Sequence, residues 1–161
     1  MLVYRIGSHR RIRDLQGTGG LYVAGRWHQK GTRILYTSSS ISLAKLEVLA
    51  NSVGKIPRSM ALITLESPDD APMLKVEEKQ LPQGWYHYPY STQLIQITEQ
   101  WLKDGADWIM RVPSAQSPTE FNYLFNPQHP MHAQLKIIEV REEKFASRFK
   151  SWILLANLII H

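Results

Sequence analysis

The 161-residue sequence contains no cysteine. Disulfide bonds, thiolate catalysis and cysteine-ligated zinc are therefore excluded, and the composition is compatible with a reducing cytosol. The sequence also lacks a continuous apolar run at its start, because residues 1–13 alternate apolar side chains with arginines. This is not the pattern of a signal peptide, and we expect a cytoplasmic protein.

Common phosphate-binding and metal-binding motifs are absent as well. The glycines between residues 17 and 25 form neither G-x-G-x-x-G nor G-x-x-x-x-G-K-[ST]. No G-x-S-x-G elbow surrounds a serine, and the six histidines lack H-E-x-x-H spacing. His129 and His132 are three residues apart, but Pro130 between them argues against a helical metal pair. We expect no metal centre.

The composition is that of an ordinary globular domain, with 43% hydrophobic and 20% charged residues. The net charge is +5, from 19 Lys and Arg against 14 Asp and Glu. Such an excess could attract nucleic acid, an acidic partner or an anionic small molecule. The basic residues are scattered and no recognition-helix or RNA-binding signature accompanies them, so we expect no direct binding of nucleic acid.

Hydrophobic patterns predict strands with two interspersed helices. Strands are expected at residues 2–6, 33–37, 60–66, 107–112 and 134–140. Helices are expected at residues 41–52, after serine N-cap candidates at 38–40, and at residues 91–105, which end in a glycine. Residues 67–89 carry four prolines and are expected to be mostly loop. Because crossover units are too few for a doubly wound sheet, the order predicts a single α+β domain.

The C-terminal residues 150–161 are almost wholly apolar. A membrane-spanning helix needs about 20 apolar residues, so this tail is too short to cross a bilayer. We expect a segment that packs on the core or on a partner, and no membrane anchor.

Glu47 stands out on the first predicted helix. At about 100° per residue it falls opposite Lys45 and is flanked by Leu43, Ala44 and Ala50. A carboxylate in an apolar arc must be paired, hydrogen-bonded or protonated, because burying it bare costs several kcal/mol. Periodicity alone does not distinguish this from a boundary glutamate whose side chain reaches water.

Four other residues are candidates for a site, although each also has an ordinary structural interpretation. Arg5 lies on the first strand, and Arg26 lies in a glycine-flanked turn where its planar fork could clamp a phosphate. The residues alone favour a surface role for Arg26 and a core role for the aromatic Tyr36. Ser114 follows Pro113 at a strand end, where loops present functional groups, but such a serine is commonplace.

Several different short motifs occur along the chain, and their order can be compared with that of known families. They are Tyr4-Arg5, Gly25-Arg26-Trp27, Gly31 with Leu35-Tyr36-Thr37, Leu43-Ala44-Lys45-Leu46-Glu47, Pro113-Ser114 and Asn126-Pro127-Gln128-His129-Pro130. In order and spacing they resemble the RES family, named for Arg, Glu and Ser, and the resemblance defines a domain over residues 1–149. Two features depart from the family pattern: His28 replaces the usual Asn after the tryptophan, and the tail lies outside it.

The resemblance implies a split mixed β-sheet core with flanking helices, similar to ADP-ribosyltransferase toxins, with a cleft for NAD. It implies a toxin that uses NAD as substrate, with no further cofactor, and cleaves the nicotinamide–ribose bond. Arg5 and Arg26 would hold the phosphates, Tyr36 would lie at the nicotinamide side, Glu47 would act at the ribose and Ser114 would position the ligand. Catalysis would then rest on Glu47, Arg26 and Tyr36. The implied partner is a Xre-type helix-turn-helix antitoxin in a hetero-oligomer.

Three functions are in competition at this point. The first is NAD cleavage with water as the acceptor, which fits the need of an oxocarbenium-like ribose for a nearby carboxylate. The second is transfer of ADP-ribose to a cellular protein from the same cleft. The third is a non-catalytic basic binding module, for which the sequence offers only its charge of +5.

Overall fold

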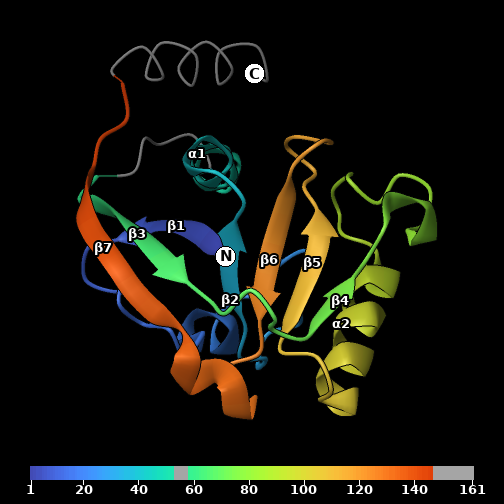
Figure 1. Cartoon of the computed structure of the whole chain (residues 1–161). Coiled ribbons are helices and arrows are strands. Elements are labelled where there is room, and N and C mark those ends of the chain that lie inside the picture. The colour runs from blue at the N-terminus through green and yellow to red at the C-terminus, as the bar shows by residue number, and fades with distance from the viewer. Residues whose placement is uncertain (53–57, 147–161) are drawn as a thin grey trace, which may run out of the picture.

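Seven β-strands form one mixed sheet in the computed structural model, which describes residues 1–52 and 58–146. The order across the sheet is β4-β5-β6-β2-β1-β3-β7 (Figure 1). Among these strands β4 and β5 pair in parallel, and the other pairs are antiparallel. The strands are β1 (Leu2–Ser8), β2 (Leu35–Ser38), β3 (Met60–Glu66), β4 (Met73–Lys75), β5 (Ile109–Pro113), β6 (Phe121–Phe125) and β7 (Lys136–Glu143).

The sheet is nearly divided between β1 and β2. β1 pairs with β3 along its whole length, from Leu2 to Ser8, whereas β1 and β2 share the single register pair Tyr4↔Ser38. Figure 1 shows the resulting halves, with β1, β3 and β7 on one side and β2, β6, β5 and β4 on the other. The predicted α+β fold with a split mixed sheet is therefore confirmed.

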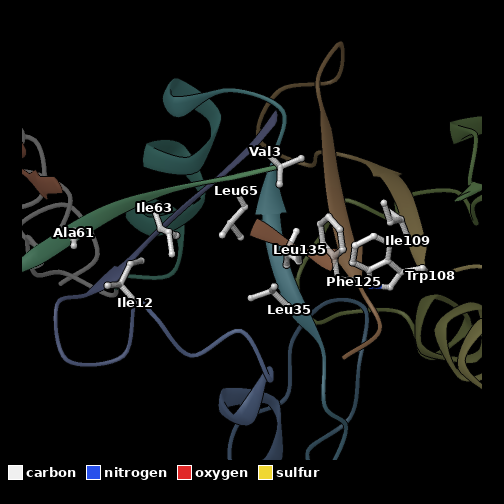
Figure 2. Close-up of a cluster of buried hydrophobic side chains, with 10 residues drawn as sticks. All are labelled: Val3, Ile12, Leu35, Ala61, Ile63, Leu65, Trp108, Ile109, Phe125 and Leu135. Carbon is white, nitrogen blue, oxygen red and sulfur yellow. The ribbon is translucent and has the colours of Figure 1, made fainter. Parts of the chain in front are cut away.

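The main core lies across both halves of the sheet. β3 carries five consecutive buried residues, in which Ala61, Ile63 and Leu65 face this core while Leu62 faces the opposite side. Figure 2 shows Leu65 in the same cluster as residues of the other half, among them Phe125 and Trp108. Burying such side chains stabilises each by about 1.5–3 kcal/mol, so this cluster holds the halves together where strand pairing does not.

Two α-helices flank the sheet, and both were predicted. α1 (Ile41–Ala50) begins after Ser40, whose Oγ accepts from the backbone N–H of Leu43 at 3.0 Å. α2 (Thr92–Asp104) begins after Ser91 and ends at Gly105, which adopts the left-handed conformation at φ 63°. α2 lies against β4 and β5, whereas α1 lies over the division of the sheet (Figure 1).

The structure differs from the predicted elements in several places. β6 was not predicted, and the expected loop at residues 67–89 contains the short strand β4 and the 3₁₀ helix η2 (Glu78–Gln80). Two further 3₁₀ helices are η1 (Thr18–Leu21) and η3 (Pro130–Gln134). η3 occupies the start of the strand predicted at 134–140, so β7 begins later, at Lys136.

The C-terminal tail at 150–161 lies outside the described residues. Among the helices that the structure does describe, none is long and apolar enough to cross a membrane.

Candidate active site

A cavity of about 480 Å³ opens where β1 and β2 separate, and α1 covers it. Four of the five predicted site residues line this cavity: Arg5 from β1, Arg26 from the turn before β2, Tyr36 from β2 and Glu47 from α1. The volume lies within the usual range of small-ligand sites. The fold therefore gathers residues that lie far apart in the sequence.

Glu47 points inward from α1, which is one of the two orientations that its helical phase left open. Its Oε1 accepts two hydrogen bonds, from Ser114 Oγ at 2.9 Å and from Asn122 Nδ2 at 2.6 Å. Both partners are neutral side chains, so the carboxylate is hydrogen-bonded by them without an ion pair. Both hydrogen bonds from described residues to this carboxylate are accepted by Oε1. Oε2 is therefore available to a molecule in the cavity.

Ser114 is buried, with 1% of its surface exposed, and its hydroxyl donates to Glu47 from outside the cavity lining. Its Oγ accepts from the backbone N–H groups of Gln116 at 3.0 Å and Ser117 at 3.3 Å. These two donors leave the hydroxyl proton for Glu47. Ser114 is absent from the cavity lining, so a direct role in positioning a ligand stays a prediction.

Asn122 on β6 completes this network and was missed in the sequence. Its Oδ1 accepts from Ser38 Oγ at 2.8 Å, which fixes the amide so that its NH₂ group faces Glu47. The contact follows from strand register, because Ser38 and Asn122 are opposite each other in the β2–β6 pair. Only the recognition of β6 as a strand beside β2 would have revealed it.

Arg26 lies at the tip of a tight turn closed by mutual backbone hydrogen bonds between Gly25 and His28. Its Nη1 donates to the carbonyls of Trp85 at 2.7 Å and His87 at 3.3 Å. Its guanidinium lies 4.7 Å from the centre of the Tyr90 ring, a cation–π distance. Burial lowers the pKa of Arg26, but a guanidinium stays charged at any physiological pH.

Arg5 is held in a similar way. Its Nη1 donates to the carbonyls of Ile12 at 3.2 Å and Asp14 at 2.9 Å. Burial lowers the pKa of Arg5, and the nearby Asp14 carboxylate opposes that shift. Both cavity arginines are thus fixed by hydrogen bonds to backbone carbonyls, which hold a guanidinium in place without cancelling its charge.

Tyr36 projects into the same cavity from β2. Its hydroxyl lies 2.7 Å from Nδ1 of His28, the residue that departs from the family pattern. Burial raises the pKa of Tyr36, so the phenol keeps its proton. Tyr36 therefore acts in this site as a neutral hydrogen-bonding group.

Metal ligands do not accompany these residues. Within residues 1–52 and 58–146, no group of three or more His, Asp or Glu side chains is placed to hold a metal ion. Among the described side chains, the titratable groups that line the cavity are one carboxylate (Glu47), two guanidinium groups (Arg5 and Arg26), one imidazole (His28) and three phenols (Tyr4, Tyr36 and Tyr90).

Comparison with known proteins shows which family the sequence matches. The sequence matches the RES domain over residues 2–147. A relative from Pseudomonas putida, called Toxin Res, is 38% identical over 143 residues, which cover 85% of this chain and 92% of that protein. Another, from a Sphingobium species and called the Prs ADP-ribosylating toxin, is 34% identical over 132 residues, 80% of this chain and 82% of that protein.

The fold also has a solved counterpart. A chain in the crystal structure of the M. tuberculosis MbcT–MbcA toxin–antitoxin complex superposes with a TM-score of 0.71 at 16% identity, covering 96% of this chain and 87% of that chain. This likeness concerns the fold, whereas the domain match and the curated relatives concern the sequence. Together they establish that the chain belongs to the RES-domain toxin family.

Proposed function

We propose that this chain is a toxin that binds NAD in the cavity and cleaves the bond between nicotinamide and ribose, with water as the acceptor. The observation that carries the proposal is the Glu47 carboxylate, fixed in the cavity by two neutral donors on one oxygen. Its other oxygen is available to the substrate, and two guanidinium groups line the same space.

The charges of the cavity fit a dinucleotide. Pyrophosphate carries two negative charges, and arginine suits it because its planar fork donates in a fixed geometry. Arg26 is bound to carbonyl oxygens and aromatic rings, and the described residues offer it no ion-paired carboxylate. Its positive charge is therefore available to a phosphate, while Glu47 supplies the negative charge for the ribose.

The reaction needs little more than this. The C1′–N bond breaks and its electron pair goes to the pyridinium nitrogen, so nicotinamide leaves as a neutral molecule without an acid. The ribose acquires oxocarbenium character, which a fixed carboxylate stabilises. Water then adds at C1′ and releases a proton, giving ADP-ribose.

Replacement of Glu47 by glutamine provides a direct test. Glu47→Gln keeps a carbonyl oxygen that can accept from Ser114 and Asn122, but it removes the charge that stabilises the ribose. We expect nicotinamide release from NAD to fall by a factor on the order of 10²–10³. Glu66→Gln on β3 is the matched control, because Glu66 is exposed and lies outside the cavity lining. Unchanged turnover in Glu47→Gln would rule out the proposed role.

The second candidate is transfer of ADP-ribose from the same site to a protein. The name of the Sphingobium relative, the Prs ADP-ribosylating toxin, favours this alternative. NAD labelled in its adenylate portion separates the two reactions. Label in a protein band supports transfer, and label confined to free ADP-ribose supports hydrolysis.

We also infer an antitoxin partner, of the Xre type with a helix-turn-helix domain. The support is the M. tuberculosis complex, which is a toxin bound to an antitoxin. Co-expression with a Xre-type antitoxin should abolish toxicity and yield a stable complex on size-exclusion chromatography. Separate elution of the two chains, with toxicity retained, would argue against this partner.

A further inference from the structure

His28 is a buried residue of the cavity wall whose two ring nitrogens are both engaged. The residue is 6% exposed and closes the Gly25–His28 turn. Nε2 lies 3.0 Å from the carbonyl oxygen of Val23, and Nδ1 lies 2.7 Å from the hydroxyl of Tyr36.

These contacts determine where the protons lie. A carbonyl oxygen can only accept, so the proton of a neutral imidazole must be on Nε2, where it is donated to Val23. Nδ1 is then a bare acceptor. The Tyr36 hydroxyl must donate its hydrogen bond to Nδ1, so it has no proton to offer to the cavity. The backbone N–H of Trp27 also interacts with the Tyr36 oxygen, which leaves one lone pair of that oxygen for the cavity.

Two glycines make room for this ring. A Cβ on Gly25 would lie 2.8 Å from Cε1 and 2.9 Å from Nδ1 of His28, closer than side chains tolerate. A Cβ on Gly20 would overlap the carbonyl oxygen of Thr32 and lie 3.1 Å from Nε2 of His28. The imidazole therefore occupies a fitted slot, in which it has little freedom to turn or flip.

We propose that His28 is a positioning residue that accepts the hydrogen bond of the Tyr36 hydroxyl, so that Tyr36 presents an acceptor and no donor to the molecule in the cavity. The substrate group at this point must then be a hydrogen-bond donor, such as a carboxamide NH₂ or a ribose hydroxyl. A carboxylate in the same place meets a lone pair and is rejected. This inference rests on the proposed function only for its kinetic readout.

The arrangement should depend on pH. Burial lowers the pKa of His28, which keeps the ring neutral at neutral pH. When acid protonates Nδ1, both ring nitrogens become donors. The Tyr36 oxygen must then accept from Nδ1, and its hydroxyl proton rotates toward the cavity. Tyr36 is the titratable group in contact with the His28 ring. Three further groups interact electrostatically with Tyr36, namely Arg26, Glu47 and Tyr90. Tyr22 and Lys30 of the flanking loop are exposed.

Two substitutions separate positioning from mere packing. His28→Leu removes both polar atoms, so the Tyr36 proton loses its acceptor. His28→Asn keeps an acceptor, because the asparagine Oδ1 is attached to Cγ as Nδ1 is in histidine. We expect kcat/KM for NAD to fall about tenfold in His28→Leu and to stay within about threefold of the parent protein in His28→Asn.

The pH profile and a double-mutant cycle provide the decisive readouts. The parent protein should lose activity in an acid limb that lies below pH 6.5, the ordinary histidine pKa, because burial lowers the pKa of His28, and His28→Asn should lose this limb. In a Tyr36→Phe background, His28→Leu should cause no further loss, because His28 acts through the Tyr36 hydroxyl. Additive effects, or an unchanged acid limb in His28→Asn, would overturn the proposal.

A measurement without turnover keeps the two proposals distinguishable. ¹⁵N NMR of labelled protein reports which nitrogen of His28 carries the proton, with His28→Asn used to assign the resonance. We expect protonated Nε2 and bare, hydrogen-bonded Nδ1 at neutral pH; a proton on Nδ1 would refute the inference. If NAD is not consumed at all, the proposed function fails, and the NMR result still decides the role of His28.

Discussion

Asn122 offers the sharpest test of how the site holds its carboxylate. It is 9% exposed, donates from Nδ2 to Glu47 Oε1 at 2.6 Å and accepts from Ser38. Asn122→Ala removes one of the two hydrogen bonds that fix Glu47. A hydrogen bond to a charged group contributes about 1.5–3 kcal/mol, so we expect kcat/KM for NAD cleavage to fall roughly tenfold to a hundredfold.

Asn122→Asp tests the same contact with opposite electrostatics. When the introduced carboxylate and that of Glu47 are both ionised, they repel each other at hydrogen-bond distance, and this raises the pKa of the pair. Once the pair takes up one proton, the repulsion is replaced by a hydrogen bond between the two groups, which restores a donor beside Glu47. Activity relative to the parent should therefore recover as the pH falls through the raised pKa, whereas Asn122→Ala should show no such recovery.

Initial rates of nicotinamide release give kcat and KM for each variant, and thermal denaturation confirms the fold. Asn126→Ala is the matched control, because Asn126 is also a buried asparagine but accepts from the backbone N–H of Gln128 instead of contacting Glu47. We expect this control to lower stability and leave kcat/KM unchanged. The reasoning fails if Asn122→Ala keeps parental kcat/KM, or if both alanine variants lose activity equally.

Two further predictions follow from buried polar groups. Ser114→Ala should lower kcat about as much as Asn122→Ala does and leave KM for NAD unchanged, because Ser114 contacts Glu47 Oε1; a rise in KM alone would instead indicate a direct ligand contact. His132 is buried between the Leu15 carbonyl and the indole N–H of Trp108, and burial lowers its pKa. The unfolded chain therefore binds this proton more readily, so stability is greatest above pH about 6.5 and falls below it. Urea midpoints at pH 7.5 and 5 should show this fall, and His132→Gln should reduce it; an equal fall in that variant would contradict the assignment.

Features encoded within one segment were predictable from the sequence. The serines before residue 41 identified the start of α1, and helical phase then placed Glu47 in an apolar arc, although it left the direction of the side chain open. Gly105 identified the end of α2 in the same way, because a left-handed residue there is best supplied by glycine. In each case the signal and its consequence lie within a few residues of each other.

Features that depend on pairing between distant segments were not predictable. Asn122 lies 84 residues from Ser38 and 75 residues from Glu47, and only the β2–β6 register brings the three together. Asn122 is a polar residue at a buried position of β6, and hydrophobic patterning gives no indication of such a position. His28 appeared in the sequence only as a departure from a family pattern, and its role depends on Val23 and Tyr36 lying on either side of its ring.

The origin of the cavity lies in the interrupted pairing of β1 and β2. Extending the antiparallel register beyond Tyr4↔Ser38 would place residue 5 opposite 37 and residue 6 opposite 36. Pairing stops instead, and residues 4–6 and 36–38 all line the cavity. Each strand stays anchored on its far edge, β1 to β3 and β2 to β6, so the opening is held by rigid neighbours. Arg5 and Tyr36 thus reach a ligand from strands that cannot move freely, which is what precise placement of charge requires.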